Sequence, residues 1–241
     1  MSIGASKVAG RGAQPLLIVT GLLREARIVA GPGITVICSS SDPHQLRAKL
    51  AVFNPSTVRG IVSFGVAGGL CPSLRPGDVV IANEVIARRG RWSASEAFSS
   101  ELANSIDTGS RKIVSGGLAG VDQVVRNRHD KAALRAATSA VAVDMESHIA
   151  ADYAAAIDLP FAALRVVSDP AHRNLPELVV DALTRNGEVD IWKIVRGIAR
   201  RPQAIPALMQ TARDFNQALA ALRGCGGLLL GGGESLVAAD L

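Results

Sequence analysis

The chain has 241 residues, a net charge of +5 and 48% hydrophobic residues, but only 3% aromatic residues. This length and hydrophobic content suit a single α/β domain whose core is built from Val, Ile, Leu and Ala. Nucleic-acid binders usually place aromatic side chains among their basic residues, so the composition argues against a nucleic-acid partner. It favours an anionic ligand or an anionic membrane surface.

The first 14 residues and the cysteines bear on the compartment. Residues 1–14 are polar and rich in Gly and Ala, without the apolar region of a secretory signal, and we expect them to be flexible. The sequence contains no run of about 18 apolar residues that would predict a membrane span. The three cysteines lack CxxC spacing, which is typical of a reducing compartment. We therefore expect a cytoplasmic protein.

Strand and helix patterns alternate through the first half of the chain. Apolar runs predict buried strands. Asp42 suits an N-cap and Pro43 the first helical position of the helix between them. A later helix has a Ser cap with a Glu three residues further on. In chain order these elements cover 16–22 (strand), 33–40 (strand), 42–53 (helix), 60–70 (strand), 77–90 (extended) and 93–106 (helix).

The alternation continues to residue 169 and predicts the fold. The further elements cover 112–120 (strand), 129–139 (helix), 140–145 (strand), 146–157 (helix) and 160–169 (strand). We expect one α/β domain over 15–223, with a mixed central sheet flanked by helices. Ligands of such sheets bind at the carboxyl ends of strands. Those ends here carry Gly21, Gly65 to Gly69, Asp144 to Glu146, and Ser168 with Asp169.

The pattern changes near residue 175 to amphipathic helices, interrupted at Asn186-Gly187 and at Pro202. In the stretch 189–202, Trp192 and aliphatic residues form one stripe, with Lys and Arg elsewhere on the turn. Such a helix either lies on an anionic membrane or packs on the domain with a solvated basic face. Residues 224–241 are rich in Gly, which predicts a disordered tail.

The glycine run GVAGGL (65–70) and the acids at strand ends are candidates for chemistry. Glycines let a backbone approach a ligand closely, although they also form turns, and the spacing is not the GxGxxG of dinucleotide sites. Glu146 either favours a helix N-terminus or presents an acid to a ligand. Asp169, before Pro170, is either a turn residue or an acid. The four histidines lack metal-ligand spacing, which predicts no metal site.

Three stretches together resemble the superfamily of purine nucleoside phosphorylases and methylthioadenosine/adenosylhomocysteine nucleosidases. They are TGLLREAR (20–27), VSFGVAGGL (62–70) and VAVDMESHIAADYAAAIDLPFAALRVVSD (141–169). The most specific parts are the glycine run, the Met-Glu pair and the R-x-x-S-D that follows it. The resemblance covers roughly residues 15–170. It implies an enzyme that cleaves the N-glycosidic bond of a nucleoside, without a cofactor and as a homo-oligomer.

The resemblance also implies a role for each matched residue. Glu146 would accept hydrogen bonds from the ribose 2′- and 3′-hydroxyls and stabilise an oxocarbenium-like sugar. Asp169, oriented by Ser168, would share a proton with purine N7 so that a neutral base departs. An Asp rather than an Asn at this position favours adenine over a 6-oxopurine. The other substrate-binding positions implied are Met145, Gly65, Ala67, Gly68 and Val124.

The match departs from the superfamily pattern where the nucleophile is handled. Nucleosidases activate water with a Glu in the first strand–helix loop; Ala26 matches that position here, with Glu25 beside it as the catalytic candidate. Phosphorylases bind phosphate with an Arg in this loop, and the stretch Gly21 to Arg24 matches that site. Their Arg and Ser near the glycine run have Ser63 and Val66 as counterparts. Hydrolysis, and phosphorolysis with phosphate as co-substrate, both stay open.

The opening TGLLREARIVAGPGITVICSSSDPHQL is similar to hopanoid-associated phosphorylases. This similarity implies a lipid-linked nucleoside, adenosylhopane, as the substrate, and peripheral contact with the inner membrane face through 189–202. One alternative is a nucleosidase for small methylthioadenosine-type substrates. Another, of a different class, is a non-catalytic protein that binds nucleosides or a membrane surface.

Overall fold

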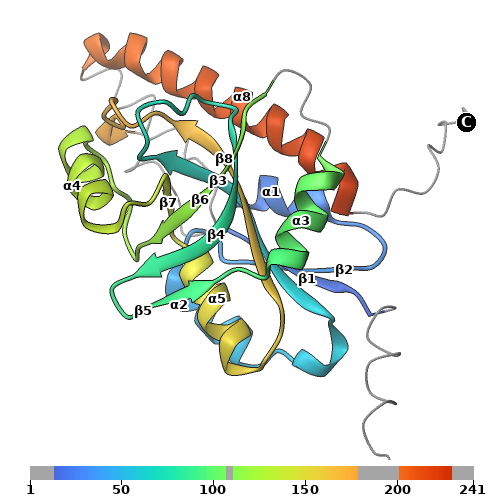
Figure 1. Ribbon diagram of the computed structural model, residues 1–241. Coiled ribbons are helices and arrows are strands. Elements are labelled where there is room, and N and C mark those ends of the chain that lie inside the picture. The colour runs from blue at the N-terminus through green and yellow to red at the C-terminus, as the bar shows by residue number, and fades with distance from the viewer. Residues whose placement is uncertain (1–13, 107–110, 179–200, 230–241) are drawn as a thin grey trace, which may run out of the picture.

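Eight strands pair into one mixed sheet in the computed structural model, which describes residues 14–106, 111–178 and 201–229 (Figure 1). The strands are β1 (Leu16–Thr20), β2 (Ile34–Cys38), β3 (Gly60–Gly69), β4 (Val79–Ala87), β5 (Gly90–Ser93), β6 (Ile113–Gly120), β7 (Ala142–Asp144) and β8 (Phe161–Asp169). The helices are α1 (Leu23–Val29), α2 (Pro43–Ala51), α3 (Glu96–Ser105), α4 (Arg128–Thr138), α5 (Ser147–Ala156) and α8 (Ile205–Leu229), with 3₁₀ turns at Pro55–Thr57 and Pro202–Ala204. This is the single α/β domain with a mixed, helix-flanked sheet that the sequence predicts.

Five of the strands close into a ring. β3 pairs with β7, β7 with β6, β6 with β4, β4 with β8, and β8 with β3 again. β1 and β2 extend the sheet in parallel beyond β3, and β5 adds antiparallel to β4. β7 runs antiparallel to β3 and pairs with Gly68 and Gly69, so it lies beside the carboxyl end of β3. The polar residues at the ends of β7 and β8 are thereby brought to the same strand.

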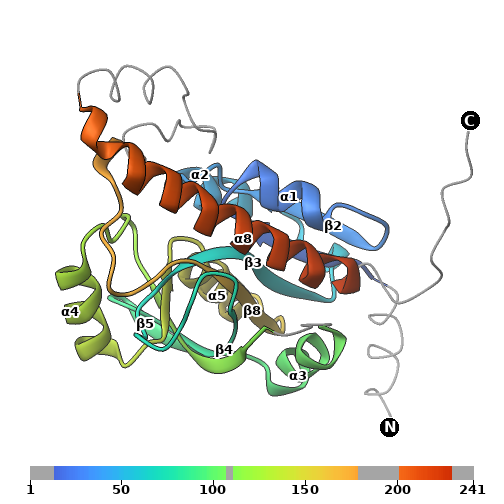
Figure 2. The ribbon, with the colours of Figure 1, turned by 90° about the horizontal axis from the view of Figure 1, so that it is seen from above.

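The side chains of β3 and β8 enter two apolar cores alternately, because successive side chains of a strand point to opposite faces of the sheet. Phe161, Ala163 and Val167 of β8 belong to one core, which α2 and α5 cover. The intervening Ala162 and Leu164 belong to the other core, which receives side chains from α1, α3 and α8. Arg165 therefore occupies a core position on the first face. Figure 2 shows α8 lying across the domain next to α1.

Local signals place the helices close to where the sequence predicts them. Asp42 caps α2 by accepting hydrogen bonds from the backbone of His44 and Gln45, as expected from its position before Pro43. Helix α3 is capped by Ser95, two residues after the Ser that opens the predicted helix. The predicted extended segment 77–90 divides into β4 and the start of β5, because the chain turns at residues 88–89.

The C-terminal boundary is the main correction. A disordered tail from residue 224 is wrong for residues 224–229, since α8 continues to Leu229. Cys225 of α8 is buried in the core that receives side chains from α1 and α3. A β-carbon on Gly226 would lie 2.5 Å from Cγ2 of Ile28, so this Gly lets α8 approach α1 closely. Segment 189–200, predicted to be a basic amphipathic helix, and the tail beyond residue 229 lie outside the described residues.

The described part of the chain offers no helix suited to crossing a bilayer. Helix α8 is 25 residues long, yet neither it nor any other described helix has a sufficiently apolar stretch.

Ending the chain at two positions tests the role of the last turns of α8. A chain that stops after residue 223 loses Cys225 and the Gly226 contact, and we expect it to be destabilised by about 2 kcal/mol. A chain that stops after residue 229 keeps both and serves as the matched control. Urea unfolding followed by circular dichroism measures the difference. Equal stability of the two truncated chains would contradict the packing of α8 on α1.

Candidate active site

A buried arginine joins three strands at the centre of the site. Arg165 of β8 is 1% exposed, and its Nε donates to Oδ2 of Asp144 on β7 at 2.7 Å. Its Nη2 donates to Oγ of Ser63 on β3 at 2.7 Å and also contacts the Asp144 carboxylate. Asp144 accepts further hydrogen bonds from the backbone and hydroxyl of Ser147 at the start of α5. Arg165 thus fixes β7 and the start of α5 against β3.

Glu25 lies in a cage of backbone N–H groups. It is 2% exposed, and Oε2 accepts from the backbone N–H groups of Gly21 at 2.9 Å and Leu22 at 2.8 Å. Oε1 accepts from Val66 at 2.8 Å. Burial raises the pKa of Glu25, and the Arg165 charge and the three backbone donors oppose that rise. Glu25 therefore ties the start of α1 to the glycine run of β3.

Glu146 is the N-cap residue of α5, yet its side chain makes no capping hydrogen bond. It is 8% exposed, and Oε1 accepts from the hydroxyl of Ser39 after β2 at 3.1 Å. Burial raises its pKa to about 7, helped by the negative charges of Asp144 and Glu25, while Arg165 and Ser39 act in the opposite direction. Of the two alternatives for Glu146, this environment favours an acid presented to a ligand over a helix cap.

Two glycines make room for these carboxylates. A β-carbon on Gly21 would lie 2.8 Å from Oε1 of Glu146, and one on Gly65 would lie 2.7 Å from Oε1 of Glu25. Both distances are shorter than real β-carbon contacts, so a side chain at either position would push the neighbouring carboxylate out of its place.

Asp169 ends β8 in a different environment. It is 8% exposed and forms an ion pair with Lys131 of α4, which is 1% exposed. The hydroxyl of Ser168 lies 3.1 Å from Oδ1 of Asp169 and 3.2 Å from the carbonyl oxygen of Ala67. A register shift after Ala67 pairs Gly68 with Asp169. Ser168 is thus in position to orient Asp169, as the sequence resemblance implies.

The remaining predicted positions lie around these groups with different exposure. Met145, which stands between Asp144 and Glu146 in the chain, is half-buried. Ala67 and Gly68 belong to the segment of β3 that borders Asp169. Val124 is half-buried in the loop between β6 and α4. Arg24 is exposed on the first turn of α1, whereas Glu25, the next residue, points inward. The structure therefore does not bring Arg24 into the buried cluster around Arg165.

Two residues of the site, Lys131 and Ser39, were not found from the sequence. Lys131 shares the inward face of α4 with Leu134 and Thr138, and a Lys at that helical spacing is the signal that could have identified it. Ser39 lies at the end of a strand, far from Glu146 in the chain, and no local pattern marks it.

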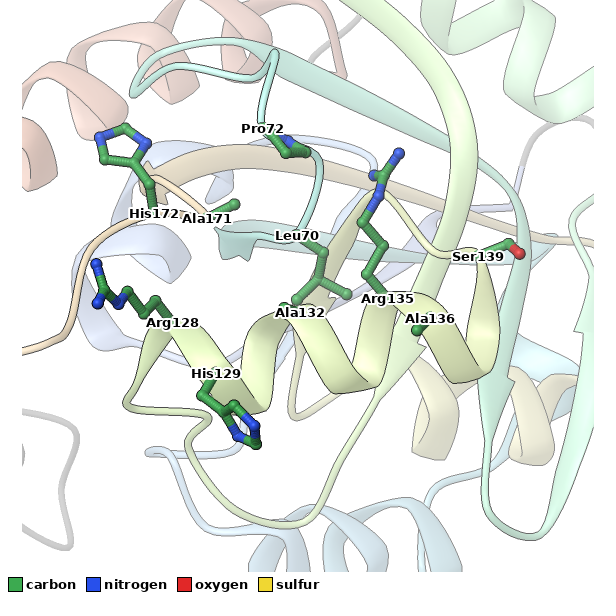
Figure 3. Close-up of a pocket in the computed structure, with 10 residues that line it drawn as sticks. All are labelled: Leu70, Pro72, Arg128, His129, Ala132, Arg135, Ala136, Ser139, Ala171 and His172. Carbon is green, nitrogen blue, oxygen red and sulfur yellow. The ribbon is translucent and has the colours of Figure 1, made fainter.

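A groove of about 680 Å³ lies between α4 and the segments that follow β3 and β8 (Figure 3). Its lining residues are Leu70, Pro72, Arg128, His129, Ala132, Arg135, Ala136, Ser139, Ala171 and His172. Neither Glu146 nor Asp169 lines it, so we place the candidate active site at the buried carboxylates rather than in this groove. Within the described ranges, no group of three or more His, Cys, Asp or Glu side chains could hold a metal ion.

Comparison with known proteins identifies relatives of this fold. A family model described as the phosphorylase superfamily matches residues 14–198. No curated protein matches the sequence. A 5′-methylthioadenosine/S-adenosylhomocysteine nucleosidase from Neisseria meningitidis superposes with a TM-score of 0.66 at 15% identity, covering 90% of this chain and 98% of that one.

Two further solved structures are similar. A futalosine hydrolase from Helicobacter pylori has a TM-score of 0.64 at 16% identity, covering 90% of this chain and 96% of that one. A 5′-methylthioadenosine/S-adenosylhomocysteine nucleosidase from Campylobacter jejuni has a TM-score of 0.61 at 15% identity, covering 89% of this chain and all of that one. At such identities these structures show the shared fold.

Replacing Arg165 tests whether it holds the buried carboxylates together. Arg165→Met leaves Asp144 buried without its partner, which should cost about 3–5 kcal/mol of unfolding free energy. Adding Asp144→Asn removes the uncompensated charge and should recover part of that loss. Chemical denaturation of both variants measures the coupling. A loss below about 1 kcal/mol in the single variant would show that the pair is not essential to the fold.

The raised pKa of Glu146 predicts a pH-dependent stability. The folded protein keeps the Glu146 proton up to about pH 7, whereas its ordinary pKa is 4.5. This contribution to stability is therefore fully present below pH 4.5 and is lost as the pH rises through about 7. At about 1.4 kcal/mol per pKa unit, the loss is roughly 3 kcal/mol.

Glu146→Gln cannot ionise, so it should lack this dependence and be more stable than the wild type at pH 8. The exposed control Glu96→Gln should keep the wild-type dependence. Urea unfolding at pH 5.5 and pH 8 measures both variants. If the stability of Glu146→Gln changes with pH as that of the wild type does, the titrating group is another residue.

Proposed function

The chain belongs to the phosphorylase superfamily and is an enzyme of the nucleoside phosphorylase and nucleosidase type, and we propose that it hydrolyses the N-glycosidic bond of an adenosine-type nucleoside and releases adenine. The observation that carries this proposal is the pair of buried carboxylates, Glu146 and Asp169, in unlike environments. Glycosidic cleavage needs one carboxylate for the sugar and one acid for the leaving group.

The spacing of the carboxylates supports a nucleoside-sized ligand. Glu25 lies against Gly65, and Asp169 lies beside Gly68, three residues further along β3. A strand rises by about 3.3 Å per residue, so these points are about 10 Å apart, which is the scale of a nucleoside. Glu146, beside Gly21 and Ser39, would bind the ribose hydroxyls, and Asp169 would face the base.

The charges favour water over phosphate as the nucleophile. Glu25, Asp144 and Glu146 surround one guanidinium, and that group is already hydrogen-bonded to Asp144 and Ser63. A phosphate dianion would meet an excess of negative charge there. Water needs no cation, and Glu25 can still accept one hydrogen bond from it, since backbone N–H groups use three of about four acceptor positions.

For the substrate we propose a lipid-linked nucleoside, adenosylhopane, because the first strand–helix segments are similar to hopanoid-associated phosphorylases. Ile205 and Met209, one turn apart on α8, are among the few large apolar side chains exposed in the described structure, and they could accept a hydrocarbon. The second candidate is 5′-methylthioadenosine or S-adenosylhomocysteine, which the similar nucleosidases from Neisseria meningitidis and Campylobacter jejuni favour by name.

Release of adenine tests the proposal. The protein is incubated with adenosylhopane in detergent or with 5′-methylthioadenosine, each with and without phosphate, and free adenine and the sugar product are measured. We expect adenine from the lipid-linked nucleoside and a rate unaffected by phosphate. The ribose that stays on the lipid should carry a 1-hydroxyl group rather than a 1-phosphate. Asp169→Asn and Glu146→Gln should each lower kcat by about 10²-fold or more.

The other outcomes separate the alternatives. Adenine from 5′-methylthioadenosine alone would assign the protein to the small-substrate nucleosidases. A strict requirement for phosphate would replace hydrolysis by phosphorolysis. Substrate binding without adenine from either nucleoside would leave the non-catalytic binding protein as the better description.

A further inference from the structure

Lys131 is a buried ammonium whose three donors are all engaged. It lies on the inward face of α4 and is 1% exposed. Its Nζ contacts Oδ2 of Asp169 and lies 3.1 Å from the carbonyl oxygen of Pro170 and 3.2 Å from that of Arg173. A lysine ammonium has three protons to donate, and here all three point to Asp169 and the segment that follows it.

The segment after Asp169 does not depend on Lys131 alone. The backbone N–H of Arg128 donates to Oδ1 of Asn174 at 2.8 Å, and that of Leu175 donates to the carbonyl oxygen of Arg126 at 2.8 Å. Arg173 also pairs with Asp214 of α8. These contacts hold the segment against α4, the residues before it and α8 independently of Lys131.

The ion pair raises a chemical question about the leaving group. A purine departs as a neutral base only if N7 receives a proton, and a carboxylate paired with an ammonium has no proton of its own to give. The nearest acidic proton to Asp169 in the described structure is on Nζ of Lys131. Ser168, the other partner of Asp169, is a far weaker acid.

We propose that Lys131 and Asp169 act together as the acid of the reaction, which rests on the function proposed above. The proton moves from Nζ to Oδ2, so the ion pair becomes a neutral amine and a neutral carboxylic acid. The carboxylic acid then donates this proton to N7 as the C1′–N9 bond breaks. The electron pair of that bond stays with the base. Water adds to C1′ and gives a proton through Glu25 to the solvent, and Lys131 regains a proton from the solvent, so no net proton is consumed.

Two variants separate a proton source from a positioning charge. Lys131→Met removes the proton and the charge. Lys131→Arg keeps the charge and the donors, but a guanidinium cannot be deprotonated in a protein. We expect both variants to lose 10²- to 10⁴-fold in kcat on the purine nucleoside that the wild type cleaves, the range for general acid catalysis. Lys112→Met, at an exposed position before β6, is the matched control and should retain activity.

A second substrate removes the need for the acid. The 7-methylated form of the same nucleoside carries a positive base that departs neutral without a proton. The wild type should cleave it, and Lys131→Met and Lys131→Arg should cleave it within about threefold of the wild-type rate. Glu146→Gln should be impaired on both substrates, because the sugar still needs its carboxylate. Thermal unfolding of each variant shows whether it is folded.

Each contrary result overturns the proposal in its own way. Full activity of Lys131→Arg on the purine nucleoside would make Lys131 a positioning residue that acts through its charge. If the Lys131 variants lose kcat equally on both substrates, proton transfer from Lys131 is contradicted. A wild type that cannot cleave the methylated nucleoside would contradict it as well. If the wild type cleaves neither nucleoside, the function proposed above fails, and Lys131 is not the cause.

Discussion

One buried positive charge determines how this site is built. Arg165 occupies a core position on β8, where the neighbouring positions on the same face are apolar, and it is surrounded by Asp144, Glu146 and Glu25. Burial alone would lower the pKa of Arg165, and these three carboxylates together raise it. A charge in this position is tolerated only when it is paired and hydrogen-bonded. The ends of β1, β3 and β7 and the starts of α1 and α5 all meet around it.

The two carboxylates with proposed roles differ because of their neighbours. Glu146 shares its surroundings with two other acids and one arginine, and its pKa is raised to about 7. Asp169 has a cation of its own, Lys131, and lies beside Gly68 and Gly69 at the end of the glycine run. Separate environments of this kind let one site hold a sugar with one carboxylate and handle a leaving base with another. The division follows from which strand end each residue occupies.

The sequence predicted what depends on local pattern and missed what depends on distant contacts. Apolar periodicity placed each long strand and most helices. The acids at strand ends, together with the resemblance to nucleoside phosphorylases and nucleosidases, singled out Glu146 and Asp169 as candidates. Helix α1 has only seven residues and gave no usable periodicity. The glycines near residue 225 predicted disorder, whereas Gly226 serves close packing. Lys131 and Ser39 bind residues far away along the chain, so only the folded topology reveals them.

The closed ring of β3, β7, β6, β4 and β8 constrains how such an enzyme can change its substrates. Each of these strands has a hydrogen-bonded neighbour on both sides, so the ring cannot widen without the loss of a ladder. Room for a bulkier group must therefore come from the helices and connecting segments outside the ring. A change of this kind leaves the strand ends, and the carboxylates that they carry, in place.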